Sequence, residues 1–267
     1  MAEEAPDDGQ RALDASVPNG SRMYRYLLDG KGSFAADREA ADKLQAQALS
    51  HGASIREMVQ VNRAFVLRGV TWCASALSIG QFLDVGCGDV LKPAVHDAAR
   101  DGYEGARVVY VDIDPVVMLH VTHLQRGPGL GAVLADAADP ASVLGDEAVR
   151  DLLDFTRPAC VVLGGTLSAM DAATARAAVA GYAKALVPGS AMIISCASYA
   201  DPEFGAEMAA LFAAASNGAG QWRNHDKETV ASFFAAGGLR LVRADVGPVL
   251  RDQERPGEVL GGVGIKP

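Results

Sequence analysis

The sequence predicts an α/β protein in which helices cover both faces of a mostly parallel β-sheet. From residue 81 onward, short apolar runs alternate with longer helix-like segments. Strands that are apolar on both faces and separated by helices are typical of a parallel sheet covered on two sides. The chain has 267 residues, of which 49% are hydrophobic, and this suits one large domain with an appendage better than two equal domains.

Three parts are expected along the chain: a disordered polar tail at 1–15, a helical extension at 16–78 and the α/β domain at 79–267. The extension has no strand pattern, and its helical segments are expected at 21–28, 35–49 and 55–77. Because these helices precede the first strand, we expect them to pack on the α/β domain as a cap.

Five strands and six helices are expected in order before the chain's last two strands. The strands are expected at 81–85, 107–111, 132–135, 159–163 and 191–195. The helices are expected at 91–100, 115–124, 141–153, 172–186, 203–215 and 227–236. The last two strands, at 239–246 and 260–265, are joined by a polar loop. Parallel neighbours need a longer crossover, so this pair is expected to be an antiparallel hairpin.

The net charge and the cysteines indicate which binding partners are excluded and in which compartment the protein is expected. A net charge of -9 and a pI near 5.0 argue against nucleic acid and against a membrane surface, because a basic face is missing. No apolar run is long enough to span a bilayer, and residues 1–8 are acidic rather than signal-like. Cys73, Cys87, Cys160 and Cys196 lack zinc-like or redox spacing, which predicts reduced thiols in the cytoplasm.

A glycine turn follows the first expected strand. Asp84, Gly86 and Gly88 stand where that strand ends, and ligands of parallel sheets bind beyond the carboxyl ends of the strands. Glycines permit positive φ and a close approach of a ligand to the backbone. A dinucleotide fingerprint would need a third glycine where Leu91 stands, which weakens a nicotinamide interpretation. An ordinary tight turn without a ligand remains the alternative.

Carboxylates and glycines also follow the next three strands. Asp112 is placed to accept from both hydroxyls of a ribose, while Asp114 is expected to cap the helix that opens at Pro115. Asp136 could accept from an adenine amino group, and Gly164 lets a loop pass close to a bound molecule. Four such features at the ends of four successive strands are much stronger than any one alone.

With these residues laid out, the chain resembles the class I S-adenosylmethionine-dependent methyltransferases. The bacterial family described only as "S-adenosyl methyltransferase" is the most similar. Its pattern is matched by residues 18–31, 34–38, 62–65, 108–112 and 153–155, and the first of these blocks is the most specific. The resemblance covers the chain from about residue 16 onward. It implies a Rossmann-like, seven-stranded, mostly parallel sheet with an antiparallel last strand.

The resemblance also assigns roles around the cofactor S-adenosylmethionine. The methionine end would be lined by Asp84, Gly86 and Gly88, and the ribose would be bound by Asp112. Ile113 would lie beside the adenine, which Asp136 and Ala137 would bind or flank. Gly164 would line the far side of the cofactor. Arg22, Tyr24 and Arg63 of the extension are candidates for closing over the cofactor, since an arginine suits its carboxylate. Packing at the surface or between helices is the alternative for these three.

Two departures from the family pattern fall on loops that are expected to face the substrate. Leu167-Ser168 stands where the family has a Leu-His pair, and residues 253–256 replace a Trp-Arg-Pro block. The third glycine of the methyltransferase motif falls on Val90. A specialised member, or one with altered chemistry, is therefore expected.

Four side chains are candidates for contact with the substrate. Ser168 lies on the altered loop, and Tyr24 and Tyr26 lie near the expected entrance, although tyrosines on an amphipathic segment often only pack. His225 precedes a helix and could act as a general base or simply be a solvated residue. His120 and His123 have the spacing of a metal pair, but no carboxylate converges on them, so no metal is expected.

The main hypothesis is methyl transfer from S-adenosylmethionine to a small molecule, such as a specialised metabolite. A second hypothesis keeps the cofactor as the substrate itself, in a cyclisation or lyase reaction that releases methylthioadenosine. A third is a non-catalytic protein that binds the cofactor as a sensor or scaffold. A homodimer is compatible with all three hypotheses.

Overall fold

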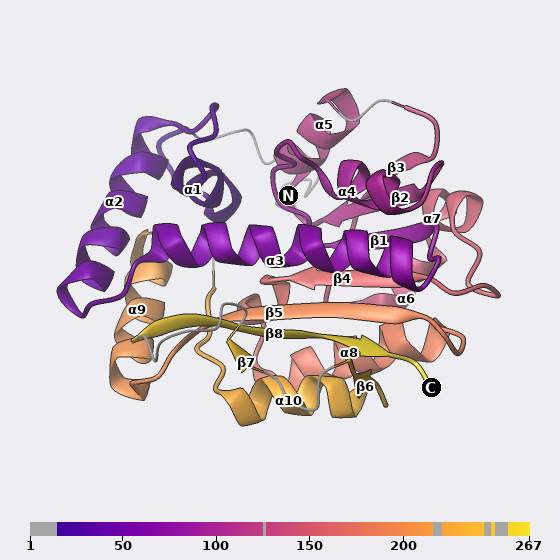
Figure 1. The fold of residues 1–267 in the computed structure, drawn as a ribbon. Helices are drawn as coiled ribbons and strands as arrows, with labels where there is room; N and C mark the ends of the chain where they lie inside the picture. Colours follow the sequence, from indigo (N-terminus) through magenta and orange to yellow (C-terminus); the bar gives the residue numbers. More distant parts are fainter. Residues whose placement is uncertain (1–14, 125–126, 216–220, 243–246, 249–255) are drawn as a thin grey trace, which may run out of the picture.

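A computed structural model of the chain describes residues 15–124, 127–215, 221–242, 247–248 and 256–267. A single twisted sheet runs through the molecule, with helices on both faces (Figure 1). The strands are β1 (Gln81–Val85), β2 (Arg107–Asp112), β3 (Leu130–Leu134), β4 (Cys160–Gly164), β5 (Ala191–Tyr199), β6 (Arg240–Leu241), β7 (Gly247–Pro248) and β8 (Gly257–Ile265). The helices are α1 (Gly20–Leu27), α2 (Ala35–Ser50), α3 (Ile55–Ala76), α4 (Val95–Gly102), α5 (Pro115–Leu124), α6 (Pro140–Gly145), α7 (Glu147–Leu152), α8 (Ala172–Ala185), α9 (Pro202–Ala215) and α10 (Lys227–Ala236), with a 3-10 turn, η1 (Thr166–Ala169).

The strand order is β3-β2-β1-β4-β5-β8-β6, and the short β7 pairs with β8. The pairs among β1 to β5 are parallel, whereas β8 runs antiparallel to both β5 and β6. This confirms the expected seven-stranded, mostly parallel sheet with an antiparallel last strand. The long β8 lies between β5 and β6, so the terminal hairpin is built into the sheet. Residues 243–246 of the expected penultimate strand lie outside the described residues.

The two faces of the sheet carry separate apolar cores because successive side chains of a strand point to opposite faces. Leu83 and Val85 of β1 belong to the core covered by α6, α7, α8 and α10. Phe82 of the same strand belongs to the opposite core, covered by α3, α4 and α5. The central strands are buried on both sides, which is why they appear in the sequence as continuous apolar runs.

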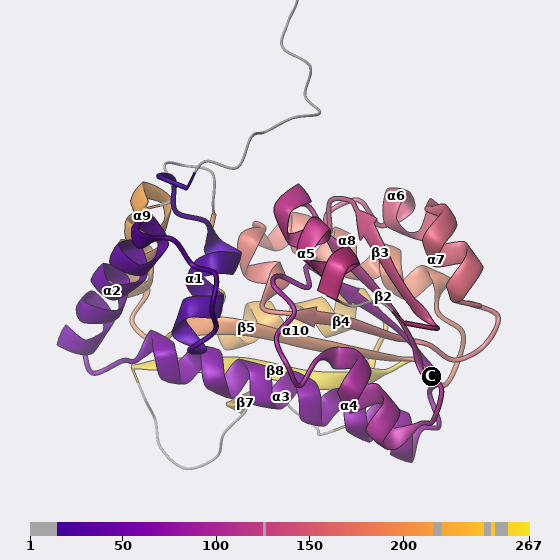
Figure 2. The ribbon, with the colours of Figure 1, turned by 90° about the horizontal axis from the view of Figure 1, so that it is seen from above.

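A third core joins the extension to the sheet. It is made of apolar side chains from α1, α2, the first half of α3, α9 and the ends of β5 and β8. Figure 2 shows α1, α2 and α9 together beyond one end of the sheet. The helix α3 belongs to two cores, since Met58 and Val59 lie in the third core while Val70 and Cys73 pack on the sheet. The extension is therefore fixed to the domain by a continuous helix.

Two helix predictions were wrong in their bounds. The helix expected from residue 91 begins only at Val95, because Pro93 disfavours helical backbone at Lys92 and lacks a donor. The glycine turn is consequently followed by irregular chain and not directly by a helix N-terminus. The helix expected at 141–153 is two helices, separated at Asp146, whose side chain caps α7 by accepting from Ala148 N. The expected tail, apart from Ala15, lies outside the described residues, as do residues 253–255 of the altered C-terminal loop. No helix within the described ranges is long and apolar enough to cross a bilayer.

Candidate functional site

The glycine turn lies at the middle of the sheet's carboxyl edge, because β1 is flanked by β2 and β4. Gly86 and Gly88 both have positive φ, at 69° and 58°. Gly86 N donates to Val111 O over 2.8 Å, which ties the turn to the end of β2. A Cβ on Gly86 would collide with the side chain of Thr166 in η1. The turn therefore passes directly beneath the loop that follows β4.

Asp112 ends β2 beside this turn. Its Oδ2 accepts from Gly88 N over 2.8 Å, and its Oδ1 accepts from Asp114 N over 3.0 Å. Burial raises the pKa of the Asp112 carboxyl, while these backbone hydrogen bonds oppose the rise. Each carboxylate oxygen accepts more than one hydrogen bond, so Asp112 is oriented and still able to accept from a diol. Asp114 caps α5 as expected, since its Oδ1 accepts from Val116 N over 2.8 Å.

Asp84 is a buried acid at the end of β1. Burial raises its pKa to about 7, the Arg63 guanidinium opposes this rise, and Asp112 adds to it. The Arg63 Nη2 donates to Leu91 O and Pro93 O, both over 2.6 Å. Arg63 thus fixes the irregular chain after the glycine turn and contributes positive potential at Asp84.

Exposed apolar side chains mark the next two strand ends. Ile113, directly after β2, is 65% exposed, and Leu134, the last residue of β3, is 57% exposed. The two strands pair Asp112 with Leu134, so the positions are neighbours at the same edge. Ile113 was predicted from the sequence and Leu134 was not, although the place of Leu134 at the end of an apolar strand was a signal.

Residues 136–137 continue this edge. Asp136 is exposed, and its Oδ1 accepts from Ala138 N over 2.8 Å. The Tyr182 hydroxyl donates to Ala137 O over 3.0 Å. Gly164, at the end of β4, faces the extension, since a Cβ there would lie 2.8 Å from Val66 Cγ2 of α3.

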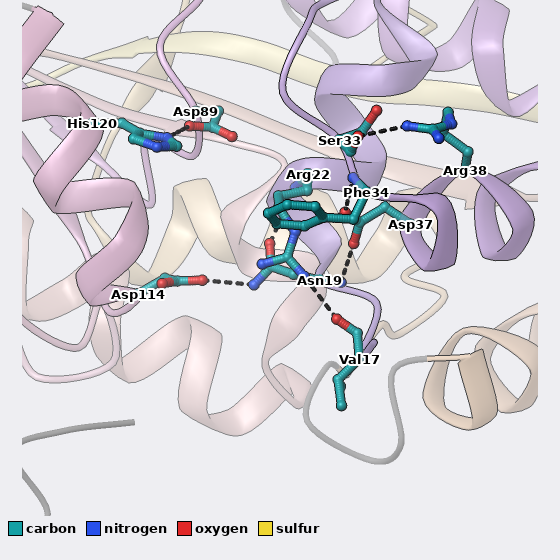
Figure 3. A network of polar contacts seen from close by, with 10 residues as sticks. All are labelled: Val17, Asn19, Arg22, Ser33, Phe34, Asp37, Arg38, Asp89, Asp114 and His120. Atoms are coloured by element: carbon teal, nitrogen blue, oxygen red, sulfur yellow. Dashed lines mark hydrogen bonds and ion pairs between the residues drawn. The ribbon is translucent and has the colours of Figure 1, made fainter. Parts of the chain in front are cut away.

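The start of α1 is tied to the end of β2 by a partly buried polar network (Figure 3). Asn19 Nδ2 donates to Asp114 Oδ2 over 2.6 Å. Asp37 of α2, fully buried, accepts from Asn19 N over 2.9 Å and from Arg22 Nε over 2.8 Å. The Arg22 Nη2 donates to Val17 O over 2.7 Å. Arg22 therefore serves the structure of the extension, and the role of its block is to fix α1 beside the turn.

A second tie joins α1 to the glycine turn. Arg25 Nη2 lies 3.2 Å from Asp89 Oδ1, and His120 Nδ1 lies 3.1 Å from the same oxygen. The His120 contact appears in Figure 3. Arg25 and Asp89 could not be predicted as partners because nothing in their spacing indicates a contact. His120, considered there as half of a metal pair, faces a carboxylate on the turn.

A cavity of about 180 Å³ lies beneath the extension. Its wall is mainly apolar and includes three methionines and four aromatic residues: Met23, Met58, Met208, Tyr24, Tyr199, Phe212 and Trp222. Gly165 and Ser168, from the loop after β4, form part of the wall. Because Thr166 of the same loop contacts Gly86, this loop lies against both the cavity and the glycine turn.

Polar groups enter the cavity wall at one side. Asn62 Nδ2 donates to the Tyr24 hydroxyl over 3.1 Å, and the Ser195 hydroxyl donates to Asn62 Oδ1 over 2.6 Å. The Tyr24 hydroxyl donates to Val59 O over 3.3 Å. Burial raises the pKa of Tyr24, so its hydroxyl stays protonated near neutral pH. Asn62 was missed, although a polar residue on the apolar face of α3 is a readable signal.

Ser168 is 3% exposed, and its Oγ has no hydrogen-bond partner among the described residues. Its polar neighbour is the Cys196 thiol. Burial raises the pKa of that thiol to about 12, and Ser168 opposes the rise. A protonated thiol is a weak hydrogen-bonding group, so the hydroxyl of Ser168, a residue of the cavity wall, has no strong partner among the described residues.

Two predicted substrate contacts lie elsewhere. The Tyr26 hydroxyl donates to Asp42 Oδ1 over 3.0 Å at the surface, and Arg56 Cζ lies 5.6 Å from the centroid of the Tyr26 ring. His225 is buried, with Nε2 at 3.2 Å from Leu167 O and 3.1 Å from Met170 O. Neither is among the described residues that line the cavity. Of the four candidates, the structure brings Tyr24 and Ser168 together.

The chain matches the family described as S-adenosyl methyltransferase over residues 6–258. A Thermobifida fusca YX crystal structure, provisionally described as a methyltransferase, is 32% identical with a TM-score of 0.81, covering 94% of this chain and 96% of that chain. A DUF574 family protein from Streptomyces avermitilis MA-4680 is 29% identical with a TM-score of 0.83, covering 95% and 99%.

A comparison with curated proteins found no match. The Burkholderia thailandensis 1,6-didemethyltoxoflavin-N1-methyltransferase, solved with 1,6-didemethyltoxoflavin and S-adenosylhomocysteine, is 16% identical with a TM-score of 0.51, covering 88% of this chain and 92% of that chain. That likeness concerns the fold alone. The family match over nearly the whole chain and the 32% identity to one solved relative establish the assignment: the chain belongs to the S-adenosyl methyltransferase family and is an S-adenosylmethionine-dependent methyltransferase.

Proposed function

We propose that this methyltransferase acts on a small-molecule acceptor, which binds in the cavity beneath the extension. The observation that carries the proposal is the shared loop after β4. Thr166 of this loop contacts the glycine turn, while Gly165 and Ser168 line the cavity. A cofactor on the turn and an acceptor in the cavity would therefore both lie against this one short loop.

The residues at the strand ends fit S-adenosylmethionine. Asp112 is oriented by two backbone donors and can accept from the ribose hydroxyls. Asp84, when ionised, supplies a negative charge near the positively charged methionine end. The exposed Ile113 and Leu134 offer apolar surface to the flat adenine, beside Asp136 and Ala137. The Arg22 guanidinium is engaged by Asp37 and Val17 O, which favours Arg63 as the arginine that holds the cofactor carboxylate.

When bound, S-adenosylmethionine supplies a methyl group on a positively charged sulfur, which leaves as S-adenosylhomocysteine. The protein then has to orient the acceptor and exclude water. Tyr24 and Asn62 are suited to orient it, because their hydrogen bonds to each other and to Ser195 fix their positions. The extension supplies much of the cavity wall.

The test is to incubate the purified protein with S-adenosylmethionine, with and without an acceptor panel, and to separate the products. S-adenosylhomocysteine that appears only with an acceptor supports the proposal. Methylthioadenosine without an acceptor would instead support the cyclisation or lyase reaction. Cofactor binding with neither product across the panel would support a sensor or scaffold, and either of these results contradicts the proposal.

We also expect a cytoplasmic protein that acts on a specialised metabolite. All four cysteines are free thiols, which supports a reducing compartment. A homodimer stays a prediction, which light scattering on the purified protein tests.

A further inference from the structure

We infer that the cavity binds an uncharged, single-ring aromatic acceptor with one hydroxyl group, held by the Ser168 hydroxyl. The inference rests on the proposed function, since it names the acceptor class for the same cavity.

We expect an uncharged acceptor because of the residues that form the cavity wall. None of the described residues that line the cavity carries a formal charge. An ion moved from water into such surroundings without a partner is strongly disfavoured. Asp84 and Arg63, the charged groups nearest to the Tyr24 hydroxyl, are not among the lining residues. A carboxylate or ammonium group on the acceptor would therefore find no partner in the cavity.

The aromatic character and size follow from the wall and the volume. Aromatic rings favour edge-to-face and stacked contacts with other rings, and methionine sulfur contacts ring edges favourably. Tyr199 and Trp222 already meet edge-on, with centroids 5.5 Å apart. A volume of 180 Å³ is close to that of the roughly 150 Å³ apolar cavities that hold benzene. One ring with a short substituent fits this volume.

We expect a hydroxyl group on the acceptor because the buried Ser168 hydroxyl lacks a hydrogen-bond partner among the described residues. A buried polar atom without a partner carries a desolvation penalty, which a ligand that pairs with it removes. A serine hydroxyl offers one donor and two acceptor sites, so it can pair with a single hydroxyl in either direction. Among the polar side chains of the wall, those of Tyr24 and Asn62 already have hydrogen-bond partners.

The experiment measures binding of 4-ethylphenol, ethylbenzene and 4-hydroxybenzoate to the full chain saturated with S-adenosylhomocysteine. A Trp72→Phe background leaves Trp222, in the cavity wall, as the remaining tryptophan of two, so its fluorescence reports on the cavity. We expect 4-ethylphenol to bind and 4-hydroxybenzoate to bind at least about 10-fold more weakly. Ser168→Ala should weaken 4-ethylphenol by about 3- to 10-fold and leave ethylbenzene unchanged.

A matched pair of variants locates the binding. Ala197→Leu places a larger side chain in the cavity wall, whereas Ala210→Leu makes the same change on the exposed surface of α9. The first should abolish binding of both neutral rings and the second should leave it unchanged. Thermal unfolding and S-adenosylhomocysteine affinity show whether each variant is folded.

Three results would overturn the inference: equal affinity for 4-hydroxybenzoate and 4-ethylphenol, equal loss for both neutral rings in folded Ser168→Ala, or no ring binding at all. Other outcomes distinguish a failure of this inference from a failure of the proposed function. Methyl transfer to a charged or larger acceptor, with no ring bound, overturns the inference alone. Ring binding that follows these expectations, with no methylation of any acceptor, overturns the proposed function and supports the cavity's ligand class.

Discussion

At the scale of single residues, the ionised Asp84 carboxylate should lower the stability of the fold and favour binding of the cofactor. Burial raises its pKa to about 7, from an ordinary value of 3.8. A carboxyl with a raised pKa in the folded state holds its proton more tightly when folded, so its contribution to stability is present at low pH. That contribution is lost as the pH rises from about 4 to about 7.

Replacing this carboxyl should therefore stabilise the protein in a pH-dependent way. Asp84→Asn should unfold with a free energy higher than wild type by on the order of 2 to 4 kcal/mol at pH 8 and close to wild type at pH 4. Its affinity for S-adenosylmethionine should fall, since the negative charge is lost. Denaturant unfolding at both pH values checks the first effect and calorimetry the second. A stability difference independent of pH would contradict the assignment.

Asp112 is expected to be the ribose ligand. Asp112→Ala should weaken S-adenosylhomocysteine binding by about 10- to 100-fold, because it removes charged acceptors from the diol and frees Gly88 N. Asp146→Ala is the matched control, since that carboxylate caps α7 away from the strand ends. Calorimetric titration of both variants is the measurement. Equal affinities of the two would show that Asp112 does not bind the cofactor.

Single residues also show what the sequence could and could not predict. Asp84, Gly86 and Asp112 were found because strand ends and turns are local features of the chain. The contact between Asn19 and Asp114 joins residues 95 positions apart, and no spacing rule reaches that far. Ser168 was named only because it departs from the family pattern, and its burial became evident from the packing of the extension.

At the scale of elements, the glycine turn depends on having no side chain at Gly86. Gly86→Ala should destabilise the protein by about 1 to 3 kcal/mol, because its φ of 69° is strained for alanine and its Cβ would meet Thr166. Gly145→Ala, at the end of α6 where a Cβ meets nothing within 4 Å, should change stability by no more than about 0.5 kcal/mol. Denaturant unfolding compares them, and similar losses would argue against a tightly packed turn.

The extension depends on Asp37 in the same way. Asp37→Ala leaves the buried Arg22 without its carboxylate and the backbone donors of Asn19 and Phe34 unpaired. We expect a loss of about 3 to 5 kcal/mol. Hydrogen exchange should rise in α1 and α2. Asp42→Ala, on the exposed side of the same helix, should cost less than about 1 kcal/mol. Unchanged exchange in the Asp37 variant would show that the network does not hold α1.

The elements differ in how well the sequence predicted them. The bounds of β1, α5 and α10 agree with the expected 81–85, 115–124 and 227–236, since each is an uninterrupted apolar or amphipathic run with clear ends. The start of α4 was wrong because Pro93 interrupts a helical pattern. The strand β8 is longer than expected because its many glycines weaken the strand pattern, while pairing with β5 along its length stabilises it.

At the scale of the molecule, α3 connects the sheet to the extension and carries Asn62 and Arg63 between them. Arg63 extends toward the glycine turn, and Asn62 toward the cavity. No single stretch of sequence could predict this cavity, because its wall comes from four helices, two strands, the loop after β4 and Trp222 of the segment before α10. The fold class followed from periodicity, whereas the site depends on how the extension packs.

The most direct test of the account is a crystal structure of the protein with S-adenosylhomocysteine and 4-ethylphenol. We predict that the ribose hydroxyls contact Asp112, and that the phenol ring lies between Trp222 and the loop after β4 with its hydroxyl on Ser168. The cofactor sulfur should face the cavity beside Tyr24. A cofactor whose sulfur faces away from the cavity, or an acceptor bound outside the extension's cover, would contradict the account.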